Sequence, residues 1–506
     1  KSMARRTFDV HWRRDGHERT RRRWRRNDRL DARKGARKRS RRGEIVQEET
    51  NGADAWNVCL QECELRLEAS WENPLQVTVR DAKRMRTNGS DKVDRIGSLL
   101  TDTFVSVAWT CVQLQAGKAE VFGTEIPVGH EFSFKGQKIA VFTWHGATIR
   151  VKGKPEVAYQ ESDTPMATYL NAHGILEARR QRAKESTGKE QELQGPRVLL
   201  AGPVDVGKSS ISKILINYAV KKGWAPVMVD LDIGQGNLTV PGAISAVPVE
   251  APIDILRGYP QEIPLVYQFG HTSPTENAEH YKYLVKRVAE VLDARCKASE
   301  HARCSGMVIN TMGWVEGLGY TLLLDAAMTL KVDVILVIGQ ERLYSVLKGE
   351  QSLKGKEIVK LPKSGGVVTR DRDYRQKSRQ MRIKEYFYGH EEEFMPHSQS
   401  VPIEALKAYR LLKKQSASNH ALPVGQTAEH KTLTVAPMDS TKDLMHTILA
   451  VSHASTVEEI AAENVAGFIY VSDIDPINNR LTYLAPCPGP LPGKYLLGGT
   501  LKAYFE

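Results

Sequence analysis

One stretch of the chain has the residue types and the spacing of a phosphate-binding loop. It fits the pattern G-x-x-x-x-G-K-[ST] and consists of Gly202, Pro203, Val204, Asp205, Val206, Gly207, Lys208 and Ser209. Glycines let backbone N–H groups curl around phosphate oxygens, the lysine reaches the β- and γ-phosphates, and the serine ligates magnesium. The alternative is a strand-to-helix turn with incidental glycines, which leaves Lys208 without a purpose. We therefore expect this loop to bind ATP and Mg²⁺, together with the adjoining Ser210.

Acidic residues follow a second apolar run. Residues 226–229 are followed by the segment D-L-D-I-G-Q-G, which contains Asp230, Asp232 and Gln235. If the run is a strand of the same sheet, these carboxylates lie at its carboxyl edge beside the phosphates. Asp232 then either holds magnesium or accepts a proton from an attacking hydroxyl. The alternative is a turn in which Asp caps its own backbone.

Two further segments carry groups suited to a nucleic acid and to a transferring phosphoryl group. Thr311 and Trp314 lie in N-T-M-G-W after another apolar run, where an aromatic ring can stack on a base; Trp314 fits core packing equally well. After Ser364-Gly365-Gly366, a helical stretch contains Arg370 and Arg375 among other arginines. Such arginines can close over a phosphoryl group, or they form a solvated basic helix.

The elements that position these residues predict several domains, since 506 residues exceed one hydrophobic core. Apolar runs spaced by helical patterns indicate an α/β fold with a central P-loop domain and a parallel sheet. Alternating segments predict a small N-terminal β-sandwich-like domain and a small, mostly β C-terminal domain. The expected parts are a disordered basic tail over 1–51, an N-terminal β domain over 52–160 with an insertion loop over 70–108, a linker helix within 161–194, the P-loop kinase domain over 195–389, and the C-terminal domain over 390–506.

The charge is concentrated at one end. Residues 1–43 carry 19 Lys and Arg against 5 Asp and Glu, whereas the whole chain has a net charge of +12, so the rest is nearly neutral. Such runs of like charge repel one another and cannot bury apolar area. The tail is either a nuclear localisation signal or a phosphate-binding arm, or simply a solvated tail. No run approaches the roughly 20 apolar residues that span a bilayer, so we expect no membrane association.

The motifs together resemble a known family. G-P-V-D-V-G-K-S-S, L-D-I-G-Q-G-N-L-T-V-P-G, P-L-V-Y-Q-F-G-H-T-S-P, N-T-M-G-W, L-P-K-S-G-G-V-V and R-I-K-E-Y-F-Y-G are similar, in this order, to the eukaryotic polyribonucleotide 5′-hydroxyl-kinases. Members of that family also serve as a subunit of the pre-mRNA cleavage and polyadenylation complex. The basic tail and the 70–108 insertion have no counterpart in the family's usual pattern.

The resemblance implies a role for each matching position. Lys208 and Ser209 would be the Walker A lysine and the magnesium-binding serine, and Asp232 would activate the 5′-hydroxyl. Gln235, Thr311 and Trp314 would hold the RNA end, and Arg370 and Arg375 would be lid arginines. Lys138 would lie near the base of ATP.

The resemblance also implies a reaction, partners and a location. We expect transfer of the γ-phosphate of ATP to the 5′-hydroxyl end of RNA, in mRNA 3′-end processing or tRNA splicing. The partners would be scaffold subunits of the cleavage and polyadenylation complex or the tRNA-splicing endonuclease, in the nucleus. The alternatives are a catalytically silent, ATP-bound scaffold subunit of that complex and a switch-type NTPase.

Overall fold

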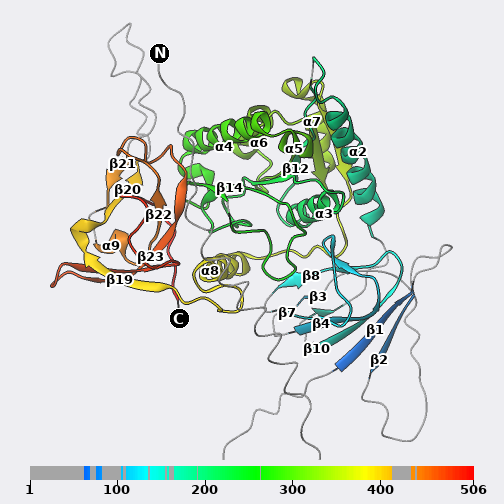
Figure 1. Cartoon of the computed structure of the whole chain (residues 1–506), viewed down its shortest axis with the longest axis horizontal. Coiled ribbons are helices and arrows are strands. Elements are labelled where there is room, and N and C mark those ends of the chain that lie inside the picture. The colour runs from blue at the N-terminus through cyan, green and yellow to red at the C-terminus, as the bar shows by residue number, and fades with distance from the viewer. Residues whose placement is uncertain are drawn as a thin grey trace, which may run out of the picture. The chain divides into compact units, whose positions relative to one another are not determined.

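The computed structural model covers most of the chain, and Figure 1 shows the order of its elements. The described residues are 62–68, 76–81, 104–105, 110–134, 137–153, 157–158, 164–190, 192–262, 264–412, 435–438 and 441–505. The basic tail predicted over 1–51 lies outside them. Within the described ranges, no helix has the length and apolarity needed to cross a membrane.

The N-terminal β module consists of short strands in one five-stranded and two three-stranded sheets. Their orders are β2-β1-β10-β4-β7, β11-β3-β8 and β6-β5-β9. Val112 and Leu114 on one strand, and Ile149 and Val151 on its neighbour, are buried at alternate positions, which confirms the predicted β domain. The strands are β1 (Glu62–Glu68), β2 (Gln76–Asp81), β3 (Phe104–Val105), β4 (Thr110–Gly117), β5 (Glu120–Val121), β6 (Thr124–Glu125), β7 (Glu131–Phe134), β8 (Lys138–Ile139), β9 (Val141–Phe142), β10 (Ala147–Gly153) and β11 (Val157–Ala158).

Part of the predicted insertion loop 70–108 is a strand. β2 pairs antiparallel with β1, from Cys63 opposite Asp81 to Glu68 opposite Gln76. The expectation of a loop is wrong here, because β2 reads Q-V-T-V-R-D and alternates polar and apolar residues. Alternation over five residues inside a long polar stretch is a weak signal, because the sequence does not show which strand pairs with it.

The central domain contains a seven-stranded sheet of order β15-β14-β13-β16-β12-β17-β18. Five of its strands, from β13 to β18 in that order, are parallel, as predicted. β14 is antiparallel to both of its neighbours, so β15 again runs in the direction of β13. The residues that follow β15 therefore reach the same sheet edge as the P-loop. The strands are β12 (Arg197–Ala201), β13 (Val227–Asp230), β14 (Ala243–Pro248), β15 (Leu265–Gln268), β16 (Met307–Asn310), β17 (Val334–Ile338) and β18 (Glu357–Leu361).

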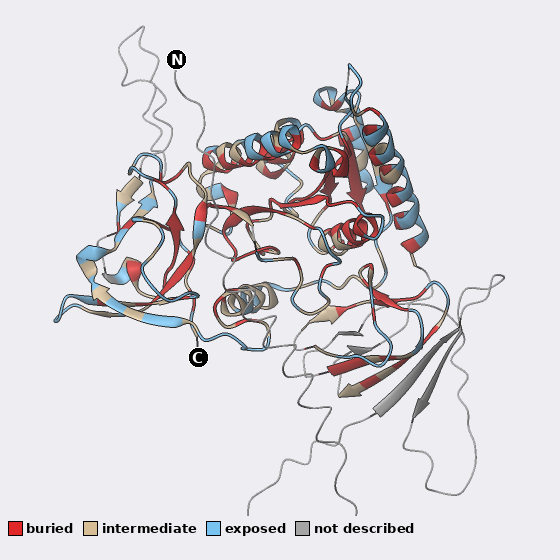
Figure 2. Ribbon diagram, viewed as in Figure 1, coloured by how far each residue is buried: buried red, intermediate tan, exposed pale blue. Residues whose placement is uncertain are grey.

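Helices cover both faces of this sheet, and Figure 2 shows its inner strands as buried, whereas the edge strand β18 is only partly buried. Alternate residues of one strand enter different cores: Leu199 packs with α4, α6 and α7, whereas Val198 and Leu200 pack with α2 and α3. This two-sided burial explains why the strands read as continuous apolar runs. The helices are α2 (Met166–Glu185), α3 (Lys208–Lys221), η2 (Pro274–Glu276), α4 (Ala278–Ala298), α5 (Glu300–Ser305), α6 (Leu318–Thr329), α7 (Glu341–Gly349), η3 (Gln351–Leu353) and α8 (Arg372–Tyr388).

The predicted linker helix is also a layer of the central domain. Met166, Tyr169 and Leu176 of α2 are buried against α3 and the sheet. The Tyr169 hydroxyl donates to the Pro362 carbonyl at 2.8 Å, which ties the helix to the segment after β18. The domain limits themselves stay predictions.

The C-terminal domain is mostly β, as predicted, with a seven-stranded sheet of order β19-β24-β23-β22-β25-β20-β21. Its core joins that of the central domain, because Phe468 and Tyr470 share a buried cluster with Val240 of the central domain and with Ile383 and Phe387 of α8. Its elements are β19 (His397–Pro402), η4 (Ile403–Ala405), β20 (Lys407–Leu411), β21 (Val435–Pro437), α9 (Thr441–Leu444), β22 (Ile448–Ser452), β23 (Val465–Asp475), β24 (Arg480–Ala485) and β25 (Tyr495–Gly498).

Candidate active site

The loop between β12 and α3 has the backbone of a phosphate cradle. Gly202 and Gly207 have φ angles of 154° and 92°, a region that favours glycine. Gly207 is also the N-cap residue of α3, and it makes no side-chain cap, so the first N–H groups of the helix can face a ligand. Ser209 and Ser210 in that first turn line the adjoining cavity. The donor set fits a nucleotide phosphate chain.

Lys208 folds back onto this loop. Its ammonium group donates to the carbonyl oxygens of Gly202 at 2.8 Å and Pro203 at 2.7 Å. Burial lowers the pKa of Lys208 to about 8, against the opposing charges of Asp232 and Asp205. Gly202 and Pro203 do not line the cavity; they hold the lysine through their carbonyl groups. A phosphate oxygen would offer the ammonium a charged acceptor in place of two neutral ones.

The two aspartates at the end of β13 have different environments. Asp230 is buried and accepts from the Asn310 side chain at 3.0 Å and the Asn237 backbone at 2.8 Å, so it fixes the loop that follows. Asp232 lines the cavity, and its Oδ1 accepts from the Gly234 backbone at 3.0 Å. Burial, followed by the charge of Asp230, raises the pKa of Asp232 to about 6, while Lys208 opposes the shift. A carboxyl group with this pKa can take a proton near neutral pH.

The two residues predicted to hold RNA after β16 are separated in the structure. Trp314 lines the cavity and is 38% exposed, so it is not a core residue. Thr311 is 4% exposed, and its hydroxyl donates to the Leu200 carbonyl of β12 at 2.6 Å. Thr311 therefore anchors the loop to the P-loop strand and does not line the cavity. The prediction that Thr311 contacts the RNA is corrected accordingly.

A different threonine lines the cavity. Thr272 follows β15, is exposed, and lines the same cavity as Gln235 and Trp314. With Asp232 and Met312, these residues form what we call the acceptor end of the cavity. Thr272 reaches this edge because β15 runs in the direction of β13.

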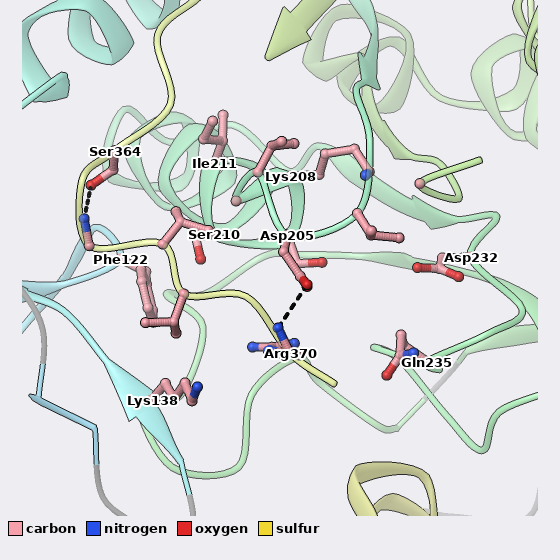
Figure 3. A pocket seen from close by; sticks show the side chains of 18 of the residues that line it. Phe122, Lys138, Asp205, Lys208, Ser210, Ile211, Asp232, Gln235, Ser364 and Arg370 are labelled. Atoms are coloured by element: carbon pink, nitrogen blue, oxygen red, sulfur yellow. Dashed lines mark hydrogen bonds between the residues drawn. The ribbon is translucent and has the colours of Figure 1, made fainter. Parts of the chain in front are cut away.

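The arginine segment lies against the P-loop. One guanidinium nitrogen of Arg375 pairs with Asp205 Oδ2 at 2.6 Å, and the Arg370 backbone N–H donates to the same oxygen at 2.9 Å. Figure 3 shows this second bond as a dashed line. Lys138 and the Arg370 guanidinium both lie over the ring of Tyr374, at 4.9 and 5.4 Å from its centroid. Arg375 is thus a cavity residue, and the alternative of a solvated helix does not describe it.

These groups share one cavity of about 410 Å³. The predicted residues that line it are Lys138, Val204, Asp205, Val206, Gly207, Lys208, Ser209, Ser210, Asp232, Gln235, Trp314, Arg370 and Arg375. Arg379, another arginine of the predicted basic stretch, lines it too, and so do residues without a predicted role, among them Glu120, Phe122, Phe142, Tyr169 and Thr272. Phe122 and Phe142 of the N-terminal β module and Tyr169 of α2 are among the apolar lining residues, and Figure 3 shows Phe122 on the opposite side of the P-loop from Asp232. These residues form a wall suited to a nucleobase.

The sequence offers few local signals for the additional residues. Glu120 is 5% exposed and accepts from the Tyr218 hydroxyl of α3 at 2.5 Å, a contact between residues 98 positions apart. Asn217 of α3 likewise donates to the Phe122 carbonyl at 2.9 Å. These bonds fix the N-terminal β module on the P-loop helix, and only the folded chain reveals them.

Comparisons with known proteins cover most of the chain. Three family models match: an N-terminal beta-sandwich domain of polyadenylation factor over residues 106–183, the mRNA cleavage and polyadenylation factor CLP1 P-loop over 202–389, and the pre-mRNA cleavage complex II protein Clp1 over 394–505. Protein CLP1 homolog of Arabidopsis thaliana is 46% identical over 389 residues, which are 76% of this chain and 88% of the relative. The human protein named polyribonucleotide 5′-hydroxyl-kinase Clp1 is 43% identical over 76% of this chain and 90% of its own length.

The chain belongs to the Clp1 family. A solved structure of wild-type Clp1p in complex with Pcf11p has the same fold, with a TM-score of 0.68 at 24% identity, covering 81% of this chain and 97% of that one. These matches confirm the predicted architecture of the chain, which consists of a β-sandwich, a P-loop domain and a C-terminal domain.

Proposed function

We propose that this Clp1-family chain is an ATP-dependent kinase that transfers the γ-phosphate of ATP to the 5′-hydroxyl end of RNA. The observation that carries the proposal is that one cavity joins the P-loop to an acceptor end with an exposed Trp314, an exposed Thr272 and the carboxyl group of Asp232. The name of the human and other animal relatives, polyribonucleotide 5′-hydroxyl-kinase, supports the same reaction.

The residues at the P-loop fit ATP with magnesium. The N–H groups from Gly207 onward and the Lys208 ammonium would hold the phosphates, and Lys138 lies at the end of the cavity suited to the base. Among the described residues no cluster of three or more His, Cys, Asp or Glu side chains that could hold a metal ion is present. A P-loop magnesium ion does not need one, because it is held chiefly by phosphates, waters and one or two protein oxygens, which here would be Ser209 and, where it does not act as the base, Asp232. The ion would neutralise charge on the phosphates.

The transfer itself needs a base, an acceptor and positive charge. The RNA 5′-oxygen forms a bond to the γ-phosphorus, the bond from that phosphorus to the bridging oxygen of ADP breaks, and ADP leaves. Asp232 takes the proton of the 5′-hydroxyl, and its raised pKa suits this role. Lys208, Arg370 and Arg375 stabilise the negative charge that spreads over the transferring group.

The acceptor end would hold the terminal nucleotide. The Trp314 ring can stack on a base, and the Thr272 hydroxyl can bond to the RNA backbone. Gln235, three residues after Asp232, lines the same cavity. Thr272 takes the role that the sequence had suggested for Thr311, because only Thr272 lines the cavity.

The wider setting is part of the proposal. Membership of the Clp1 family supports action in mRNA cleavage and polyadenylation, with scaffold subunits of that complex as partners and the nucleus as the location. The solved relative in complex with Pcf11p supports an assembly of this kind. A role with the tRNA-splicing endonuclease is a further part of the proposal, which rests on the family resemblance.

The decisive experiment supplies γ-labelled ATP with RNA of identical sequence carrying either a 5′-hydroxyl or a 5′-phosphate. Label is expected on the 5′-hydroxyl RNA alone, and none with the Lys208→Ala variant. Tight retention of ATP without label on any RNA would support the silent scaffold instead. ATP hydrolysis that does not depend on RNA ends would support a switch-type NTPase.

A further inference from the structure

The last described residues of the chain, 499–505, cross from the C-terminal domain to the central domain, and we call them the C-terminal strap. They are held on the C-terminal side by backbone bonds: the Ala503 N–H donates to the His446 carbonyl at 2.9 Å, and the Ile448 N–H donates to the Leu501 carbonyl at 3.2 Å. Leu501 and Ala503 are buried. The strap is therefore a fixed part of the fold.

The strap contacts the loop that carries Thr272. The Thr500 N–H donates to the Gly270 carbonyl at 2.9 Å, and the Thr500 hydroxyl lies 3.0 Å from His271 Nδ1. The two backbones approach so closely that a Cβ on Gly499 would lie 1.9 Å from the Gly270 carbonyl oxygen. The strap is thus bonded to Gly270, two residues before Thr272 of the acceptor end.

The strap also contacts the helix that carries the lid arginines. The side-chain amide of Gln380 donates to the Lys502 carbonyl at 2.9 Å, and its carbonyl oxygen accepts from the Tyr504 N–H at 3.2 Å. One glutamine thereby bonds to a C=O and an N–H two residues apart on one edge of the strap backbone, as a neighbouring strand would. Gln380 directly follows Arg379, which lines the cavity.

The two halves of α8 (Figure 1) have different surroundings. In its second half, Ile383 and Phe387 are buried, and the Phe387 ring lies 5.9 Å from that of Phe505 in the strap. In its first half, Arg375 and Arg379 line the cavity. Gln380 lies at the junction of the two halves. Its two hydrogen bonds are the contacts between the described strap and α8 that lie nearest to the cavity-lining Arg375 and Arg379.

We propose that the C-terminal strap is a positioning element for phosphoryl transfer, which holds the Thr272 loop through Thr500 and the arginine helix through Gln380. Gln380 is a positioning residue, since it acts through Arg375 and Arg379 and does not itself line the cavity. This inference rests on the proposed kinase function. It extends the proposed kinase function because the C-terminal domain would then help to position the arginines that stabilise the transferring phosphoryl group. Small displacements of such groups lower the reaction rate.

The test uses the full-length chain and two glutamines of the same helix. Gln380→Leu removes both bonds to the strap at nearly constant volume. Gln376→Leu is the matched control, because Gln376 is exposed, lies one turn earlier and does not line the cavity. Loss of two hydrogen bonds predicts a kcat about three- to tenfold lower for Gln380→Leu, with ATP affinity within about twofold of wild type. Gln376→Leu should match wild type in both.

A second pair of variants tests the other contact. Thr500→Val removes the hydroxyl and should raise KM for 5′-hydroxyl RNA about threefold without changing KM for ATP. Thr500→Ser keeps the hydroxyl and should restore the wild-type value. A Thr500→Ser variant as impaired as Thr500→Val would overturn the role of this bond.

Hydrogen exchange separates this inference from the proposed function. The amides of residues 372–380 should exchange faster in Gln380→Leu than in Gln376→Leu, whatever reaction the protein performs. Equal exchange in the two variants would overturn the proposal that the strap positions the arginine helix. Faster exchange in Gln380→Leu with an unchanged kcat would also overturn it, because Gln380 would then stabilise the helix without affecting the reaction. If wild-type protein labels no RNA, the kinase proposal fails, and the exchange comparison alone decides whether the strap fixes the arginine helix.

Discussion

Two threonines, one buried and one in the cavity, allow a sharp test of the acceptor end. Thr311 donates to the Leu200 carbonyl at 2.6 Å inside the fold, whereas Thr272 is exposed in the cavity. Replacing either by valine removes a hydroxyl at nearly constant volume. Thr311→Val loses a buried hydrogen bond, which costs about 1 kcal/mol of the free energy of unfolding and lowers the melting temperature by about 2–4 °C. Thr272→Val is expected to leave the fold intact and to remove the proposed bond to RNA.

The expected kinetic effects are opposite to the effects on stability. For Thr272→Val, the loss of about 1 kcal/mol in the transition state lowers kcat/KM for 5′-hydroxyl RNA about fivefold, with unchanged melting temperature. For Thr311→Val, kcat/KM stays close to wild type at a temperature well below the transition. Scanning calorimetry and steady-state labelling of a short RNA measure both quantities on the same preparations. An RNA defect in Thr311→Val with normal kinetics in Thr272→Val would refute our placement of the acceptor.

Variants at three further residues probe other groups. Asp232→Asn should lower kcat at least about 100-fold while retaining ATP, measured by labelling and by equilibrium binding, because it removes the base. Arg375→Ala should lower kcat about 100-fold and Arg375→Lys should recover only part of this, because lysine keeps the charge but not the planar guanidinium, one nitrogen of which pairs with Asp205. Burial lowers the pKa of His280 from 6.5 to about 4, so the unfolded chain binds more protons between these values and stability falls as the pH drops through them. The fall amounts to about 3 kcal/mol, and urea titrations of His280→Gln from pH 7 to pH 4 should show a correspondingly smaller loss.

The nucleotide half of the site could be predicted from the sequence because its signals are local. The P-loop needs two glycines, a lysine and a serine at fixed spacing, and the strand and helix around it are contiguous in the chain. Asp232 follows directly from the rule that parallel strands end at one edge of the sheet. The structure has both features where the sequence predicts them.

Thr272 could not be predicted in the same way because its strand is short and unusual. β15 has only four residues, Leu265–Gln268, and it joins the sheet through the antiparallel β14. Once β15 is recognised, the carboxyl-edge rule applies to it as well and leads to the loop after Gln268. Thr311 satisfies the same rule from β16, yet its hydroxyl turns inward to β12. The rule gives the edge on which a residue lies, but side-chain direction depends on tertiary partners.

A silent scaffold and a kinase make the same demands on the P-loop, so the acceptor end must distinguish them. Trp314 is 38% exposed, and Val204, in the P-loop beside it, is 55% exposed. Gly313 lies against Val204, where a Cβ would come within 2.5 Å of the Val204 backbone nitrogen. Folding alone favours covering such apolar surface, at about 25 cal/mol per Å². A ring exposed beside the phosphate loop would gain stabilisation from a base stacked on it, a contact that the proposed kinase needs and a scaffold that only retains ATP does not.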